Sequence, residues 1–301
     1  MKSSIPPSKV VQGHPDHALL SAIKSEIIRR GGGEAQFKSW FAQMLRDSID
    51  FIIETPKTGR RLITELASTE KTYLGTRVEI EIKGELNLKK GKLDAIILGH
   101  DVDIKNTIGS TWMIPREAIG HPMILVASDE NTAKFYVGLM VAHPHNLTAG
   151  QNQDKKNSVS AAGFSNILWL FNGESYPRNF WMTLPPKTVA HIVSQPNGNA
   201  RIIELFRTVQ GKPIDRSLID ATARQKDFMR RTRSDKTNGR KGTRDILAEE
   251  GMLVLNGHYD KKLIADLGLP KCGQSQFISY TVKDAADVDL ASKHGKKVTL
   301  P

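Results

Sequence analysis

The sequence predicts two domains: an α/β domain in which helices flank a mixed central sheet, and a smaller C-terminal domain of three helices and a β-hairpin. The chain has 301 residues, 39% of them apolar, and domains of about 150 residues are common. Runs typical of strands lie between residues 93 and 143, with helical patterns on either side. Residues 172–186 contain three prolines among turn residues, as connectors do. We therefore expect a first domain at 1–172, a linker at 173–183 and a second domain at 184–301.

Two amphipathic helices are expected at the start of the first domain. In residues 17–30 and 35–53, apolar side chains recur every three or four positions, as on the buried face of a helix. The triple glycine at 31–33 separates them. The next segment, STEKTYLGTRVEIEI at 68–82, fits both a four-residue helical spacing and a two-residue strand spacing through Leu74, Val78, Ile80 and Ile82. Glu70 near its start favours the helix.

Four short runs bounded by Gly, His-Pro or Asp-Glu-Asn predict a central sheet of at least four strands. In chain order they are LDAIIL, DVDIKN, HPMILVAS and AKFYVGLMVAH. The polar stretch GQNQDKKNS follows the last of them. We expect the next run, VSAAGFSNILWLF at 159–171, to form a helix that closes the first domain.

In the second domain, three helices are expected in KTVAHIVSQ, ARIIELFRTVQ and DRSLIDATARQKDFMRRTR, with Asp215 at the N-cap of the third. The runs GMLVLNG and FISYTV then predict a β-hairpin, with a short helix from Asp260 between its strands. Three helices followed by a hairpin, with basic residues on and after the third helix, are typical of a winged helix-turn-helix. The polar tail from Lys283 is expected to be loose.

The charge of the chain predicts a polyanionic partner, and nucleic acid is the commonest one. Lys and Arg number 43 against 32 Asp and Glu, a net charge of +11, and residues 224–244 alone hold nine basic and two acidic residues. This segment could be an ordinary solvated helix face with a loop. If it instead enters a DNA groove, its basic residues divide between phosphates and base edges: Arg224, Lys226, Arg230, Arg231, Arg233, Arg240 and Lys241.

Several function classes are disfavoured by what the sequence lacks. The lone cysteine, Cys272, excludes an internal disulfide and a multi-cysteine zinc site, and it is expected to be a small buried residue. No run approaches the ~18 apolar residues of a membrane span, and the start MKSSIPPSKVV lacks the apolar core of a secretory signal. We therefore expect a cytoplasmic protein with no membrane partner. The only histidine cluster, HPHN at 143–146, is expected to be a turn and not a metal site.

Two acids and a lysine on the first two expected strands form the candidate site. Asp103 and Lys105 share one face of a strand, and Asp94 meets them if the two strands pair as a hairpin around 99–100. Two carboxylates and the carbonyl of Ile104 are hard oxygen ligands suited to Mg²⁺. A cation and a lysine beside the attacking water are what phosphodiester hydrolysis requires. The pattern by itself also fits an exposed strand face with an ordinary Asp–Lys pair.

Longer segments point to a known family. The segments TEKTYLGTRVEIEI, WMIPREAIGHP, RIIELFRTVQGKPI and LIADLGLP, with the acid–acid–lysine motif, resemble the NaeI-type restriction endonucleases of the PD-(D/E)xK nuclease superfamily. The resemblance covers most of residues 35–282 and implies a restriction-endonuclease-like α/β core. It implies catalytic roles for Asp94, Asp103 and Lys105, with Glu79 as the acid of the preceding helix and a metal ligand. Leu93 stands where the superfamily motif has proline, and Glu70 and Glu81 are the alternatives to Glu79.

The resemblance also implies an activity. Members are homodimers that use Mg²⁺ to cleave double-stranded DNA at a short palindrome, with a C-terminal domain that binds a second copy of the site. Lys155 and Lys156, in the polar loop after the sheet, are expected either to contact DNA near the cleavage site or to be ordinary surface lysines. Two alternatives remain: a non-catalytic DNA-binding regulator, and a DNA nickase of the mismatch-repair kind.

Overall fold

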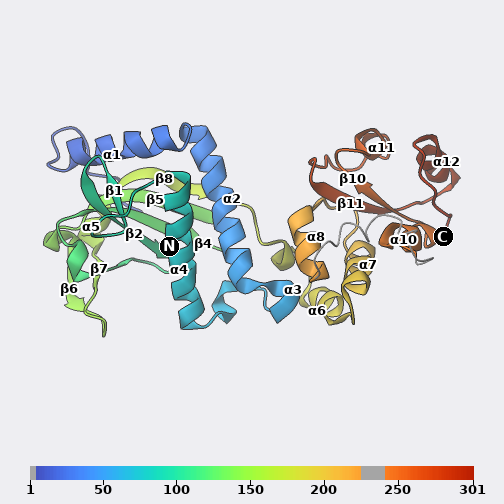
Figure 1. The fold of residues 1–301 in the computed structure, drawn as a ribbon, viewed down its shortest axis with the longest axis horizontal. Coiled ribbons are helices and arrows are strands. Elements are labelled where there is room, and N and C mark those ends of the chain that lie inside the picture. The colour runs from blue at the N-terminus through green and yellow to red at the C-terminus, as the bar shows by residue number, and fades with distance from the viewer. Residues whose placement is uncertain (1–4, 225–240) are drawn as a thin grey trace. The chain divides into compact units, whose positions relative to one another are not determined.

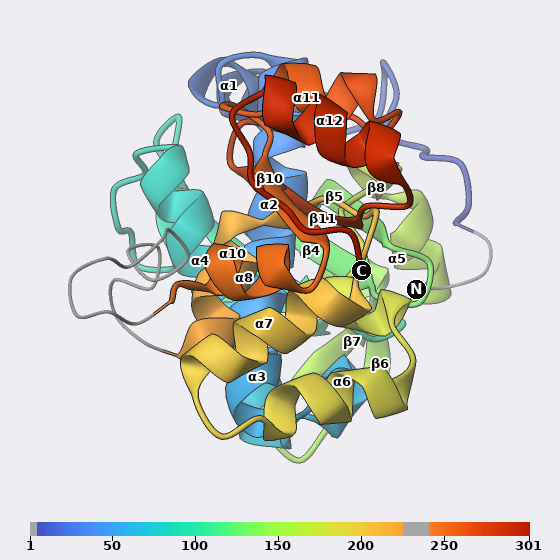
Figure 2. The same ribbon diagram turned by 90° about the vertical axis from the view of Figure 1, so that its right-hand side faces the viewer.

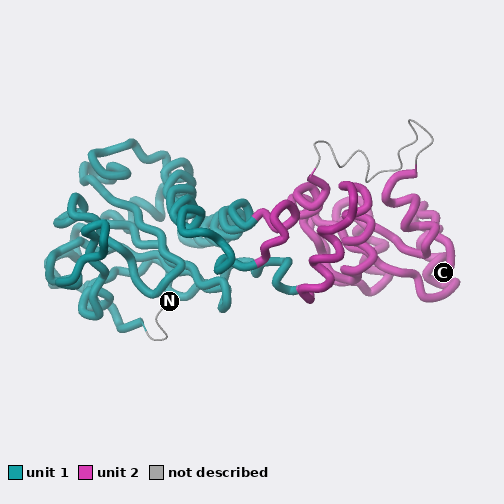
Figure 3. Tube along the Cα trace, turned by 90° about the horizontal axis from the view of Figure 1, so that it is seen from below, with its two compact units in different colours: residues 1–53, 62–183 teal, residues 54–61, 184–301 magenta. Residues whose placement is uncertain are grey.

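The computed structural model describes residues 5–224 and 241–301, and the chain forms two compact units (Figure 1). Unit 1 comprises residues 1–53 and 62–183, and unit 2 comprises residues 54–61 and 184–301 (Figure 3). The short helix α3 (Thr55–Thr58) falls in unit 2, where it contacts α8 (Arg216–Ala223). Within the described residues, no helix combines the length and apolar character needed to cross a bilayer.

A mixed five-stranded sheet forms the centre of unit 1, in the order β1-β2-β4-β5-β8. β2 and β4 are parallel and the other neighbours are antiparallel. The four expected strands are therefore confirmed. The strands are β1 (Ala95–Ile97), β2 (His100–Thr107), β4 (Pro122–Asp129), β5 (Lys134–Val141) and β8 (Leu168–Ser175).

Both faces of this sheet are covered. Helices α1 (His17–Arg30), α2 (Glu34–Ile53) and α4 (Ser68–Glu85) pack on one face, as Figure 1 shows. The other face packs against α5 (Ala161–Ser165) and a three-stranded sheet of β3 (Met113–Ile114), β7 (Asn157–Val159) and β6 (Leu147–Gln151). Alternate residues of β4 point to the two faces, so Ile124 and Val126 join the helical core and Met123 and Leu125 the other core. Burial on both faces explains the continuous apolar run of this strand.

The ambiguous segment at 68–82 is helical, as expected. Leu74, Val78 and Ile82 are buried on one face of α4, whereas Ile80 is 55% exposed. The two-residue alternation through Ile80 therefore has no structural counterpart. Glu70 starts the helix by accepting a hydrogen bond from the Ala67 backbone N–H at 2.8 Å.

The helix expected at 159–171 is wrong for residues 168–175. Only Ala161–Ser165 is helical, and Leu168–Ser175 is strand β8, which pairs antiparallel with the otherwise open edge of β5. A short apolar run fits helix or strand equally, and here pairing with a distant edge decides. Residues 173–183, expected as a linker, hold the end of β8 and a 3-10 helix at Phe180–Thr183 with Trp181 buried. Further 3-10 helices span Ile63–Glu65, Arg116–Ala118 and Pro144–Asn146.

Unit 2 contains the expected helices and β-hairpin. Helices α6 (Pro186–Ser194) and α7 (Gly198–Thr208) precede α8, and β10 (Met252–Asn256) pairs antiparallel with β11 (Gln276–Thr281). A third strand that the sequence analysis missed, β9 (Ile214–Asp215), pairs with β11 on its other side. The remaining helices are α10 (Thr243–Glu249), α11 (Lys261–Asp266) and α12 (Ala285–Lys293), with α11 and α12 above the hairpin in Figure 2.

Two expectations about unit 2 are corrected. α8 ends at Ala223, because Arg224 adopts a left-handed conformation with φ 52°. Arg224 is therefore not part of α8, and residues 225–233 of the expected helix lie outside the described residues. The tail from Lys283 is ordered, since it forms α12 and then Thr299 donates hydrogen bonds from its hydroxyl and its backbone N–H to backbone carbonyls at the end of α10.

Candidate active site

A tight hairpin between β1 and β2 brings the candidate site residues together. Leu98 and Gly99 have positive φ values of 51° and 83°, and Ile97 pairs with His100. Two left-handed residues are what a two-residue hairpin turn needs. Because Ala95 pairs with Val102, this register places Asp94 opposite Asp103.

The charged side chains converge in the structure. Asp94 Oδ2 accepts a hydrogen bond from the Ile104 backbone N–H at 2.8 Å. The Lys105 ammonium donates to Asp103 Oδ1 at 2.8 Å and lies 3.4 Å from the Ile104 carbonyl oxygen. The same nitrogen is 3.8 Å from Asp94 Oδ2. Two carboxylates, one carbonyl and one ammonium thus meet at the end of the hairpin.

Asp103 is an unusual carboxyl group. Its side chain is 5% exposed, and its Oδ2 is buried without a hydrogen-bond partner in the described part of the chain. The pKa of Asp103 is raised to about 7, mainly by burial and less by the nearby Asp94, while Lys105 acts in the opposite direction. A buried oxygen left without a partner is costly unless something else binds it. Oxygen donors are also the ligands that Mg²⁺ prefers, so these residues fit such a cation.

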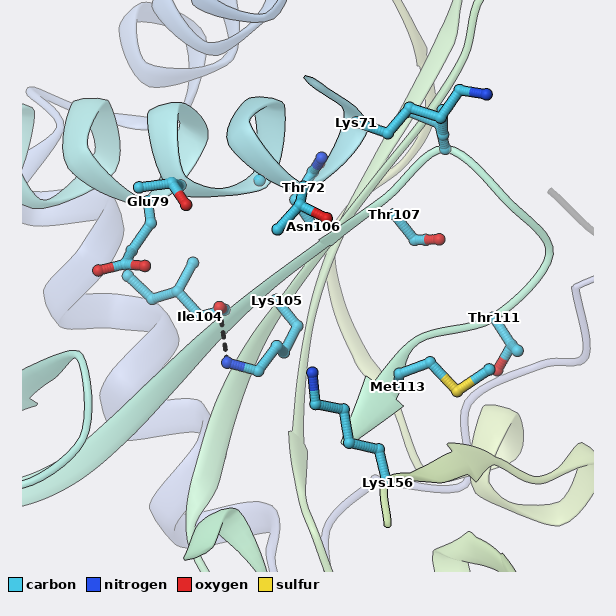
Figure 4. A pocket seen from close by; sticks show the side chains of 13 residues that line it. Lys71, Thr72, Glu79, Ile104, Lys105, Asn106, Thr107, Thr111, Met113 and Lys156 are labelled. Carbon is cyan, nitrogen blue, oxygen red and sulfur yellow. Dashed lines mark hydrogen bonds between the residues drawn. The ribbon is translucent and has the colours of Figure 1, made fainter. Parts of the chain in front are cut away.

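Glu79 stands on the wall of the pocket next to this cluster (Figure 4). It projects from α4, lines the same pocket as Ile104 and Lys105, and is paired with Lys83. Of its two neighbours, Glu70 caps the helix start and Glu81 pairs with Arg77 at 3.3 Å. Glu79 is therefore the acid of this helix that faces the pocket. Within residues 5–224 and 241–301, no three His, Cys, Asp or Glu side chains cluster as metal ligands.

The pocket has a volume of about 410 Å³ and is open to solvent on one side. Its lining comes from α4, the end of β2, the segment leading into β3, and the loop before β7. Lys156 lies on the wall opposite α4, whereas Lys155 is exposed in a left-handed conformation, with φ 59°. Lys156 is thus the one of these two expected DNA contacts that lies beside Lys105.

The other expected DNA contacts lie in unit 2. Arg224 follows the last residue of α8, and Lys241 pairs with Glu249 at 2.6 Å. The remaining ones lie outside the described residues: Lys226, Arg230, Arg231, Arg233 and Arg240. Cys272 is buried, as expected. HPHN forms a 3-10 turn in which His143 bonds to Asp16 at 2.9 Å.

The side of α4 that lines the pocket was not predicted from the sequence. Lys71, Thr72, Gly75 and Thr76 line the pocket together with Glu79. Their spacing of three and four residues would have grouped them on one stripe, turned away from the buried Leu74, Val78 and Ile82.

Comparison with known proteins identifies the family of the chain. A family model described as Restriction endonuclease NaeI matches residues 37–294. The chain is 34% identical over 260 residues to a Type II restriction enzyme NaeI from Lentzea aerocolonigenes, covering 82% of this chain and 80% of that protein. The resemblance inferred from the sequence is thereby confirmed. The chain belongs to the NaeI family of type II restriction endonucleases.

Proposed function

We propose that this chain hydrolyses phosphodiester bonds in both strands of DNA at a short palindromic site, in a reaction that depends on Mg²⁺. The observation that carries the proposal is the convergence of Asp94, Asp103 and Lys105, together with a buried Asp103 Oδ2 that has no hydrogen-bond partner among the described residues. A cation at this point would relieve the cost of that oxygen and would serve the chemistry of a family that cleaves DNA.

Asp94, Asp103 and the Ile104 carbonyl would hold the Mg²⁺, with Glu79 assisting from the pocket wall. When bound, this cation supplies polarisation of a phosphoryl oxygen and a lowered pKa of the attacking water. Asp94 has a second task, because its hydrogen bond to the Ile104 N–H fixes the backbone that carries the ligand carbonyl. Positioning by such a hydrogen bond is typical of metal sites.

Lys105 would orient or help deprotonate the water that attacks phosphorus. Its ammonium lies between the two carboxylates and the Ile104 carbonyl, and its side chain is 28% exposed, so it reaches the pocket. There it can also stabilise the negative charge that develops on the pentacovalent phosphorus.

Cleavage of both strands of a palindrome requires two such sites related by a twofold axis. We therefore propose that the protein acts as a homodimer, because one site cuts one strand. The twofold symmetry of the dimer would then match that of the DNA site.

Unit 2 is proposed to be a winged-helix domain that binds a second, effector copy of the site. The support is its topology, in which α7, β9, α8, α10, β10 and β11 follow in this order and the sheet order is β10-β11-β9. Helices followed by a hairpin whose last strand lies centrally suit such a domain, and the basic residues 224–241 lie between α8 and α10 in the sequence.

Supercoiled plasmid incubated with and without Mg²⁺ tests the proposal. Linear product that forms only with Mg²⁺ supports it. Open circles alone indicate a nickase, and plasmid left intact across many DNA sources indicates a DNA-binding regulator.

A further inference from the structure

Apart from Glu79, one face of α4 has no role in the catalytic steps described above. The face consists of Lys71, Thr72, Gly75, Thr76 and Glu79, and all five line the pocket that contains Lys105 (Figure 4). The opposite face of the helix is buried in the core. Apart from Lys71 and Glu79, the pocket face carries only small side chains, so the helix backbone is closely approachable from the pocket.

Gly75 is not required by the packing of the protein. A Cβ atom at this position would meet no atom within 4 Å, and the backbone there is ordinary helix. Glycine inside a helix is also less favourable than other residues. Gly84, in the same helix but outside the pocket lining, is equally unobstructed. What distinguishes Gly75 is that a side chain there would project into the pocket.

The pocket is suited to an anionic chain. Lys156 lies on the wall opposite α4 beside Lys105, and Lys71 lines the far end of the pocket, where it has no carboxylate partner within the described residues. Glu79 is the only acid among the described lining residues, and Lys83 neutralises it.

We propose that this pocket seats the sugar-phosphate backbone of the cleaved strand beside the scissile phosphate, with Lys71 and Lys156 as positioning residues and Gly75 as the space that admits the strand. The inference rests on the proposed function and assigns residues to its substrate. From Lys71 to Glu79 the helix rises about 12 Å, which corresponds to between three and four nucleotides at about 3.4 Å per nucleotide. The face is thus long enough to accompany the strand over several phosphates.

Replacement of Gly75 by leucine tests the seat, with Gly84→Leu as the matched control. Leucine favours helix over glycine, so both variants should melt at or above the wild-type temperature. In single-turnover cleavage of a short duplex at saturating enzyme, Gly75→Leu should be slowed at least ~100-fold, because a strand displaced by about 1 Å already loses that much. Gly84→Leu should stay within about twofold of wild type. Wild-type cleavage by a folded Gly75→Leu variant overturns the inference.

The positioning lysines are tested by DNA binding without cleavage, in the absence of divalent metal. Each phosphate contact removed should lower the slope of log K against log salt by about 0.9. We expect this smaller slope in Lys71→Ala and in Lys156→Ala. The slope should return to the wild-type value in Lys71→Arg, and it should be unchanged in Lys38→Ala, a variant on α2 outside the pocket. Unchanged slopes in both pocket variants overturn the inference. A protein that cuts no DNA but shows the slope changes would overturn the proposed function. The assignment of the pocket to binding of the DNA backbone would still hold.

Discussion

The buried carboxyl of Asp103 makes the metal-free protein less stable as the pH rises. Its pKa is raised from 3.8 to about 7, first by burial and then by Asp94, with Lys105 opposing. The folded state therefore binds this proton more tightly than the unfolded state. The stability that the proton contributes is fully present below pH 3.8 and is lost as the pH rises to about 7. Each pH unit corresponds to about 1.4 kcal/mol, so the loss amounts to at most about 4 kcal/mol.

Asp103→Asn removes this dependence, because the amide has nearly the same shape and does not ionise. All four tryptophans lie in unit 1, so their fluorescence during urea unfolding in EDTA reports the unit that holds the site. The stability of the variant relative to wild type should grow by up to about 4 kcal/mol between pH 4 and 7 and then level off. Asp154→Asn, whose wild-type carboxylate is 71% exposed, should show no such trend. A difference between Asp103→Asn and wild type that does not vary with pH would refute the reasoning.

Three further predictions concern the site and the stability of unit 1. Lys105→Ala should lower the cleavage rate by at least ~100-fold while a gel-shift assay still finds DNA bound, since one donor to a developing charge contributes about that much; undiminished cutting would rule out its assigned role. EDTA should stop cleavage and added Mg²⁺ should restore it, and cleavage that persists in EDTA would exclude the metal. Glu130→Ala should lower the free energy of unfolding by about 1–3 kcal/mol, because buried Arg46 keeps only its ion pair with Asp50 and the Tyr176 hydroxyl loses its acceptor; urea unfolding close to wild type would contradict this.

The parts of the fold that local pattern determines were predictable from the sequence. The stripe of α4 and the short bounded runs of β2 and β5 depend on neighbouring residues in the chain, and they formed as expected. The prediction for Leu168–Ser175 was wrong because its apolar run fits a helix or a strand. The segment forms a strand because it pairs with the open edge of β5. The short strand β9 was missed for a similar reason, since two residues become a strand only by pairing with β11.

The candidate site was likewise predictable from the sequence only in part. Asp94, Asp103 and Lys105 lie on one hairpin, so the strand period and a two-residue turn were enough to bring them together. The pocket wall with Lys156 comes from a segment about 50 residues further along the chain, and only packing of the second sheet places it there. To choose Glu79 over Glu70 and Glu81, one must know which side chains of α4 face the pocket. The sequence left this orientation uncertain by about one helical turn.

Mapping both 5′ ends of the cleavage product on a plasmid of known sequence tests the central claim most directly. If Asp94, Asp103 and Lys105 form one of two symmetric sites, both strands break at positions related by the twofold axis of one short palindrome, and Lys105→Ala leaves the plasmid intact. Breaks confined to one strand, breaks scattered without a common sequence, or unchanged cutting by Lys105→Ala would contradict the account.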